Sequence, residues 1–224
     1  MAKYSRIDVI LRIREAGIVP VFYHKDPEIC RGVIKSCFDG GLKVFEFTNR
    51  GDYAHELFSE LGKWAEREVP GMIMGAGSVI DQPTTALYIQ TGANFIVSPI
   101  MNLDMAKICN RRKILWIPGC GSLTEINQAE EFGAEIVKIF PGLATGGPDF
   151  IRAVKGPCPW TSIMPTGGVE PTIENLGEWF SAGATCVGIG SNLFTKDLVQ
   201  GKEWRRLTKR IAAAVKITKM LKSV

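Results

Sequence analysis

The feature that most constrains the fold of this chain is a regular alternation of short apolar runs with longer amphipathic stretches. Eight runs are typical of buried strands, at residues 18–23, 42–47, 72–74, 95–97, 114–117, 136–140, 162–164 and 186–189. Helical patterns accompany them at residues 27–39, 53–67, 83–91, 102–111, 122–131, 148–154, 171–181 and 191–199. Strands that alternate with helices pair in parallel and are joined by right-handed crossovers. The sequence therefore predicts an α/β protein with eight strand–helix units.

Eight units favour a closed (β/α)8 barrel, the TIM barrel, over an open doubly wound sheet. An open dinucleotide-binding sheet would carry a GxGxxG motif after its first strand, and none stands there. The length of 224 residues fits a barrel, which needs about 200 residues at least. Residues 3–16 and 200–222 are expected to form an extra N-terminal helix and a C-terminal helix. Because no linker interrupts the pattern, we expect residues 1–224 to form a single barrel domain.

Composition and charge argue against several classes of protein. With 46% hydrophobic and 22% charged residues, the chain is neither disordered nor fibrous. The net charge of +4 is small, and the basic residues near the C-terminus interleave with apolar ones, which is typical of a surface helix. Six cysteines without a CxxC pair and only two histidines disfavour a zinc site. Without a leader or an apolar run of ~18 residues, we expect a cytoplasmic protein that binds neither nucleic acid nor membrane.

Two charged residues stand inside predicted strands. Glu46 lies between two phenylalanines, and Lys138 lies between Val137 and Ile139. Strand side chains alternate between faces, so Glu46 shares its face with Val44 and Thr48. If both faces point inward, a carboxylate and an amine meet near the mouth of the barrel, where barrel enzymes have their active sites.

Two interpretations of this pair stay open at this point. A buried ion pair can fix the core without any chemistry. Alternatively, burial lowers the pKa of a lysine and raises that of a glutamate. A partly neutral Lys138 would be a nucleophile toward carbonyls, and Glu46 could move the protons that imine chemistry requires.

Other polar groups follow the predicted strands. Arg50 could clamp a substrate carboxylate, or it is a solvated loop residue. Ser78, after two glycines, could offer its hydroxyl to a ligand or only cap a helix. Three candidates are weaker: His24 could touch a ligand near the mouth of the barrel, His55 falls inside a helical pattern and is expected at the surface, and no histidine is placed to activate Cys120.

Glycine-rich turns follow the seventh and eighth strands. Their sequences are PTGG at residues 165–168 and GIGS at residues 188–191. Barrels often bind phosphate after these two strands, because glycines let backbone N–H groups approach an anion. The pair of turns favours phosphate binding over plain turns.

Eight segments, taken together and in order, resemble the 2-keto-3-deoxy-6-phosphogluconate (KDPG) and 4-hydroxy-2-oxoglutarate (KHG) aldolase family. They are GIVPV at 17–21, GGLKVFEFTNR at 40–50, GAGSV at 75–79, FIVSP at 95–99, IPG at 117–119, VKIFP at 137–141, MPTGGV at 164–169 and VGIGS at 187–191. The resemblance covers roughly residues 17–195.

The resemblance implies a class I (Schiff-base) aldolase that uses no metal or other cofactor and assembles as a homotrimer. Its substrate would be a small keto acid, cleaved to pyruvate and an aldehyde: glyceraldehyde 3-phosphate from KDPG, or glyoxylate from KHG. Matched by motif, Lys138 resembles the Schiff-base lysine and Glu46 the general acid/base. The matched substrate-binding residues are Arg50 and Ser78 for the pyruvate carboxylate, Pro99 and Phe140 for the pyruvate pocket, and Thr166, Gly167, Gly168, Gly190 and Ser191 for the phosphate.

Three residues depart from the family pattern. Ser78 stands where threonine is usual, Ile100 follows Pro99 where glycine is usual, and Ile189 replaces a glycine of the last turn. Two rival functions remain at this point: a sugar-phosphate epimerase or isomerase, and a non-catalytic protein that binds a phosphorylated metabolite.

Overall fold

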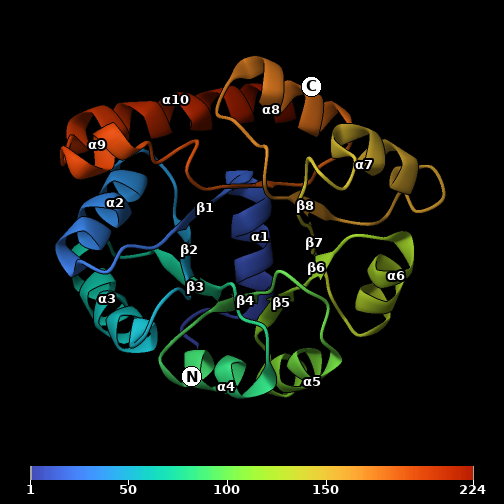
Figure 1. Ribbon diagram of the computed structural model, residues 1–224, viewed down its shortest axis with the longest axis horizontal. Coiled ribbons are helices and arrows are strands. Elements are labelled where there is room, and N and C mark those ends of the chain that lie inside the picture. Colours follow the sequence, from blue (N-terminus) through green and yellow to red (C-terminus); the bar gives the residue numbers. More distant parts are fainter. Residues whose placement is uncertain (1, 224) are drawn as a thin grey trace.

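A computed structural model describes residues 2–223 and places ten helices around nine short strands (Figure 1). The strands are β1 (Ile18–Phe22), β2 (Val44–Thr48), β3 (Ile73–Gly77), β4 (Phe95–Val97), β5 (Leu115–Ile117), β6 (Gly119–Cys120), β7 (Val137–Ile139), β8 (Ile163–Pro165) and β9 (Val187–Ile189). The helices are α1 (Arg6–Ala16), α2 (Pro27–Asp39), α3 (Ala54–Glu68), α4 (Gln82–Gln90), α5 (Leu103–Arg112), α6 (Leu123–Glu131), α7 (Gly147–Lys155), α8 (Ile173–Ser181), α9 (Lys196–Gln200) and α10 (Trp204–Lys222).

Local signals explain where many of the helices begin. In six of them a short polar side chain before the first turn accepts a hydrogen bond from a backbone N–H that has no partner within the helix. These residues are Ser5, Asp26, Asp81, Asn102, Ser122 and Thr172. Capping residues therefore mark the starts of these helices in the sequence, in addition to the apolar pattern that predicts the alternation of strands and helices.

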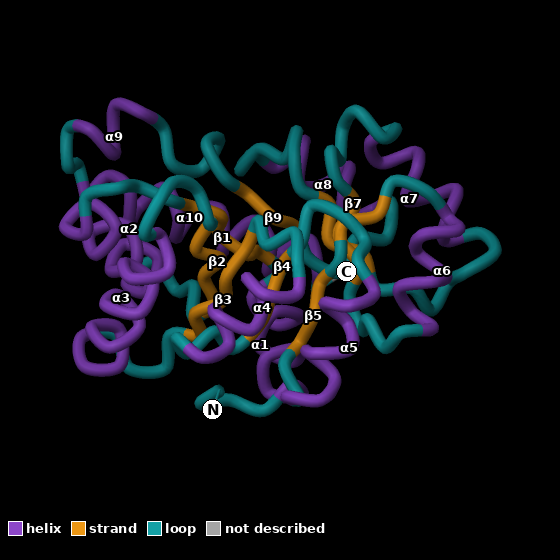
Figure 2. Tube along the Cα trace, turned by 60° about the horizontal axis from the view of Figure 1, so that its bottom comes forward, coloured by secondary structure: helices purple, strands orange, loops and turns teal. Residues whose placement is uncertain are grey.

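All strand pairs are parallel and form two curled sheets (Figure 2). One sheet has the order β5-β4-β3-β2-β1-β9, and the other has the order β6-β7-β8. Pro118, which has no N–H to donate, separates β5 from β6, so the single predicted strand at 114–117 continues beyond it as a second short one. At the other side, a parallel bridge joins Thr166 to Gly188. The prediction of an α/β fold with a parallel sheet is confirmed.

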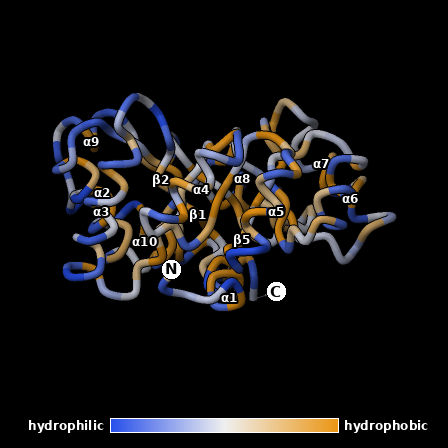
Figure 3. Tube along the Cα trace, turned by 90° about the horizontal axis from the view of Figure 1, so that it is seen from below, coloured by the Kyte–Doolittle hydropathy of each residue, from blue (hydrophilic) through white to orange (hydrophobic). Residues whose placement is uncertain are grey.

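Side chains on the two faces of the strands form two apolar layers. The outward face packs against the surrounding helices, with Phe45 and Phe47 of β2 as examples. The inward face forms a smaller cluster, with Val44, Ile73 and Met164 among its members. In Figure 3 the hydrophobic segments accordingly gather in the strands and on the helix sides that cover them. This alternation places Glu46 and Lys138 on the inward face.

Helix α1 fills one end of the inner layer. Val9 and Ile13 are completely buried against the first inward residues of the strands, such as Val19 and Val44. Figures 1 and 2 show α1 lying across the curled sheets, beneath the ends at which the strands begin. The predicted extra N-terminal helix thus exists, and it leaves the opposite, carboxyl ends of the strands for a site.

The prediction of one helix over residues 191–199 is wrong. The carbonyl of Gly190 accepts hydrogen bonds from the N–H groups of Leu193 and Phe194, which makes a tight turn after β9. Helix α9 therefore begins only at Lys196, and the C-terminal helix begins at Trp204 rather than at residue 200.

The long C-terminal helix α10 is amphipathic, as predicted. Its own residues Leu207, Ile211 and Val215 are buried on the side that faces the protein, whereas its basic residues face outward. Within residues 2–223, no helix combines the length and apolar character that crossing a membrane requires.

Candidate active site

Lys138 and Glu46 lie together inside the curled sheets, near the carboxyl ends of their strands. Lys138 Nζ is 3.9 Å from Glu46 Oε1, and the two side chains are 3% and 0% exposed. They come from β7 and β2, which belong to different sheets. The distance exceeds that of a hydrogen bond, so the amine and the carboxylate are close enough to act on one small molecule without being tied to each other.

Gly77 makes room for the Glu46 carboxylate. A Cβ atom on Gly77 would lie 2.0 Å from Glu46 Oε1, which is far inside contact distance. Gly75 accommodates the ring of Phe95 in the same way, and both glycines face inward.

The Glu46 carboxylate has no hydrogen-bond partner among the described residues at either oxygen. Its burial raises the pKa of Glu46 above 4.5, although the positive charges of Lys138 and Arg50 act in the opposite direction. A raised pKa suits a carboxyl group that must both accept and return a proton near neutral pH.

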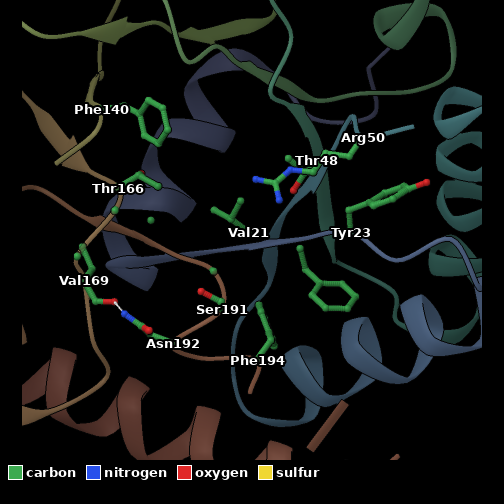
Figure 4. A pocket seen from close by; sticks show the side chains of 15 residues that line it. Val21, Tyr23, Thr48, Arg50, Phe140, Thr166, Val169, Ser191, Asn192 and Phe194 are labelled. Atoms are coloured by element: carbon green, nitrogen blue, oxygen red, sulfur yellow. Dashed lines mark hydrogen bonds between the residues drawn. The ribbon is translucent and has the colours of Figure 1, made fainter. Parts of the chain in front are cut away.

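A cavity of about 340 Å³ opens beside this pair, at the carboxyl ends of β1, β2, β8 and β9 (Figure 4). Seven residues predicted to bind substrate line it: Arg50, Phe140, Thr166, Gly167, Gly168, Gly190 and Ser191. In Figure 4 the guanidinium of Arg50 points into the cavity, beside Thr48.

Lys138 and Glu46 lie one layer beneath the cavity lining. Thr48 follows Glu46 on the inward face of β2, and Phe140 follows Lys138 at the end of β7. Both of these residues line the cavity, and Lys138 Nζ lies 5.1 Å from the centre of the Phe140 ring. The amine therefore lies close beneath the part of the cavity lining that Phe140 forms.

Two glycine turns, one after β8 and one after β9, also line the cavity. Gly167 and Gly168 have φ angles of 96° and 80°, which favour glycine. Among residues 2–223, no carbonyl or side chain accepts a hydrogen bond from either of their N–H groups. Thr166 Oγ1 is buried without a partner, and a Cβ on Gly188 would lie 2.2 Å from it. These polar groups can bind an anion.

Two predicted substrate-binding residues do not line this cavity. Ser78 is half-buried just after β3, and Pro99 is half-buried after β4. A Cβ on Gly119 would lie 2.2 Å from the carbonyl carbon of Pro99, so the Pro99 backbone packs tightly against β6. Both residues follow strands that neighbour β2 or β5, and their contact with substrate stays a prediction.

The departures at Ile100 and Ile189 have different settings. Ile100 is 47% exposed in the loop after β4. Ile189 is completely buried on the outward face of β9, in the layer between strands and helices. The Ile189 side chain therefore points toward the helices and away from the cavity.

Several cavity residues were missed from the sequence. Thr48 could have been found, because it shares the inward face with Glu46. Tyr23, Asn192 and Phe194 carried no such signal, since they lie in turns beyond β1 and β9 whose path the sequence does not show.

The weaker candidates lie outside this cavity. His24 Nδ1 accepts a hydrogen bond from the Asp26 N–H and so shapes a turn. His55 lies on α3. Cys120 is buried among the helix-facing residues, and burial raises its pKa to about 12. No group of three His, Cys, Asp or Glu side chains in the described part of the chain could hold a metal ion.

Comparison with known proteins decides the family. The family profile described as KDPG and KHG aldolase matches residues 9–210 of this chain. The chain belongs to the KDPG and KHG aldolase family. As a member of this family it is an aldolase, a carbon–carbon lyase.

Two curated relatives of this aldolase show how far the similarity extends. The 2-dehydro-3-deoxy-phosphogluconate aldolase of Pseudoalteromonas atlantica is 35% identical over 202 residues, which cover 90% of this chain and 91% of that protein. The KHG/KDPG aldolase of Escherichia coli K12 is 30% identical over 204 residues, with 91% and 92% covered.

A solved structure supports the same assignment. The KDPG aldolase of Legionella pneumophila, with pyruvate captured as a covalent carbinolamine intermediate, superposes with a TM-score of 0.82. It is 26% identical, and the match covers 91% of this aldolase and 96% of the Legionella chain.

Proposed function

We propose that this aldolase reversibly cleaves KDPG to pyruvate and glyceraldehyde 3-phosphate through a Schiff base on Lys138. The observation that carries the proposal is the buried pair of Lys138 and Glu46, 3.9 Å apart, beneath a cavity that is also lined by glycine turns. The carbinolamine in the Legionella relative supports it, because a carbinolamine is the adduct that loses water to give a Schiff base.

In the first step Lys138 attacks the C2 carbonyl of the keto acid as a neutral amine. The hydroxyl of the carbinolamine that forms takes up a proton and leaves as water, so that a protonated imine remains. Arg50, which points into the cavity, and Ser78 bind the carboxylate of the substrate. Pro99 and Phe140 enclose the carbon atoms next to the imine.

In the second step Glu46 removes the proton from the C4 hydroxyl. The C3–C4 bond breaks, its electron pair moves into the imine, and the aldehyde leaves. The enamine takes a proton at C3 from Glu46, and water then hydrolyses the protonated imine, which releases pyruvate, a proton and the free amine. The raised pKa of Glu46 fits this alternation between acid and base.

The glycine turns bind the distal phosphate of the substrate. Thr166, Gly167, Gly168, Gly190 and Ser191 line the cavity after β8 and β9, and backbone N–H groups suit phosphate oxygens. With 4-hydroxy-2-oxoglutarate the same steps give pyruvate and glyoxylate, and a carboxylate replaces the phosphate. The absence of any metal requirement stays a prediction.

We also propose that residues 1–224 form one closed (β/α)8 barrel that assembles as a cytoplasmic homotrimer. Two contacts support closure: the Lys138 N–H donates to the Pro118 carbonyl at 2.7 Å beside β5, and Thr166 bridges to Gly188. Sedimentation equilibrium would give three times the chain mass, and a monomer mass would contradict the trimer.

The Schiff base is tested by trapping. The protein is incubated with pyruvate, reduced with borohydride and digested, and the peptides are weighed. We expect a reduced pyruvate adduct on Lys138. Its absence there would overturn the proposal.

Two variants serve as controls. Lys138→Arg keeps a cation beside Glu46 but cannot form the imine, so we expect neither adduct nor pyruvate release in a coupled dehydrogenase assay. Lys107→Arg, at an exposed residue of α5, should behave as the parent protein. An epimerase or a binding protein would form no adduct in any of the three.

A further inference from the structure

The turn that follows β9 is fixed to the turn that follows β8 by one side chain, that of Asn192. Its Nδ2 atom donates a hydrogen bond to the carbonyl of Val169 at 2.9 Å, and Figure 4 shows this bond at the edge of the cavity. Within residues 2–223, the two turns are joined by the Thr166–Gly188 bridge and by this hydrogen bond, and by no other hydrogen bond.

Asn192 is itself held from behind by helix α10. The Nη2 atom of Arg210 donates to the backbone carbonyl of Asn192 at 2.7 Å. Arg210 is exposed and is not part of the cavity lining, so this bond acts on the backbone of the turn from outside. Phe194, two residues further on, packs edge-to-face on Phe22 of β1 with ring centres 5.2 Å apart.

These contacts fix the spacing of the glycine N–H groups on either side of the cavity. The turns are short, and the strands that carry them pair only through a single bridge at this end. Without a further link, each turn could move separately, and N–H groups bind an oxyanion well only when they converge on it.

We propose that Asn192 is a positioning residue that determines the preference of this aldolase for phosphorylated substrates, with Arg210 as its support. The inference rests on the proposed function, since it assigns the glycine turns to the phosphate. Lys138 and Glu46 come from other strands, and within residues 2–223 no hydrogen bond or ion pair joins either of them to Asn192, so we expect Asn192 to act on phosphate binding.

The test compares Asn192→Ala and Arg210→Met with the parent protein in two measurements. One is KM and kcat for KDPG. The other is the pyruvate concentration that gives half-maximal borohydride trapping, which does not involve a phosphate. Because Asn192→Ala loses one hydrogen bond, we expect its KM for KDPG to rise roughly three- to tenfold. Arg210→Met should change KM in the same direction by a smaller factor, and pyruvate trapping and kcat should stay unchanged.

Lys209→Met is the matched control for charge. Lys209 is the exposed neighbour of Arg210 on α10, and its substitution removes one positive charge without touching the turn. If Lys209→Met raises KM as much as Arg210→Met, the effect is general electrostatics and the positioning role of Arg210 is wrong.

The outcomes separate this inference from the proposed function. If the parent protein traps no pyruvate, the Schiff-base mechanism fails. If it traps pyruvate and Asn192→Ala leaves KM for KDPG unchanged, or weakens pyruvate trapping as much as KDPG binding, the inference fails while the aldolase stands.

Discussion

At the scale of single residues, the site depends on a position that has no side chain. Gly77 leaves the space that the Glu46 carboxylate occupies. Gly77→Ala would displace the carboxylate from its place beside Lys138, and a displacement of about 1 Å can cost 10²-fold in rate. We expect kcat to fall by about tenfold or more in the pyruvate-release assay, with a stability loss of roughly 1–3 kcal/mol from overpacking. Unchanged kcat would show that Glu46 has another way to adapt.

Glu46 also gives the protein a pH-dependent stability. Its pKa in the folded state is raised above 4.5, so the folded protein binds the proton more tightly than the unfolded chain does. The free energy of unfolding therefore falls as the pH rises from about 4.5 through the folded-state pKa. Below pH 4.5 the carboxyl is protonated in both states, and the cost of burying an ionised carboxylate is absent. In Glu46→Gln this contribution disappears.

The measurement is urea unfolding of the parent protein and of Glu46→Gln between pH 4 and pH 8, roughly. The difference in free energy between the two should change in favour of Glu46→Gln as the pH rises. A difference that stays constant with pH would mean that burial does not shift the pKa of Glu46.

The alternation of side chains along strands was enough to predict from the sequence that Glu46 and Lys138 belong to one site. Each stands between apolar residues in a short run, and period-two alternation leaves only two faces for it. The sequence could not tell an ion pair from a catalytic pair, nor show that Gly77 faces Glu46, because both depend on which strands neighbour each other. Asn192 was missed because the sequence does not show the path of the turn beyond β9.

At the scale of elements, glycine again decides how closely two helices approach. Gly32 lies in the middle of α2, and a Cβ there would be 2.5 Å from the ring of Trp204 at the start of α10. Gly62 lies within α3 and would meet nothing within 4 Å. The two glycines have the same helical context but opposite surroundings.

We therefore expect Gly→Ala to have opposite effects at these two positions. Gly62→Ala should stabilise the protein by about 0.5–1 kcal/mol, because alanine is the better helix former. Gly32→Ala should destabilise it by about 1–3 kcal/mol, because the indole of Trp204 must shift. Chemical denaturation measures both, and the same sign for both variants would contradict this packing.

The elements themselves were largely predictable, since apolar runs and capping residues coincide along the chain. The helix expected at 191–199 was not, because Gly190 turns the chain before a helix can start, and a turn of this kind leaves the apolar pattern unchanged. The short strand β6 was missed because the apolar run at 114–117 ends before Pro118, and the two residues Gly119 and Cys120 give no pattern of their own.

At the scale of the whole molecule, α1 closes the inner layer at the end opposite the cavity. Ile13 is completely buried there, whereas Leu11 on the same helix is 59% exposed. Ile13→Ala should lower the free energy of unfolding by about 2–5 kcal/mol, and Leu11→Ala by no more than about 0.5 kcal/mol. Equal effects in a denaturation experiment would mean that α1 does not pack on the strands as described.

The inward glycines have a consequence for anyone who wishes to redesign this protein. The space above Gly77 belongs to Glu46, that above Gly75 to Phe95, and that above Gly188 to Thr166. A larger residue at any of these sites can be accepted only if its neighbour across the strands is trimmed at the same time, so variant libraries should change them two by two. Gly119 is the exception, because it faces the Pro99 main chain, which no substitution can shorten.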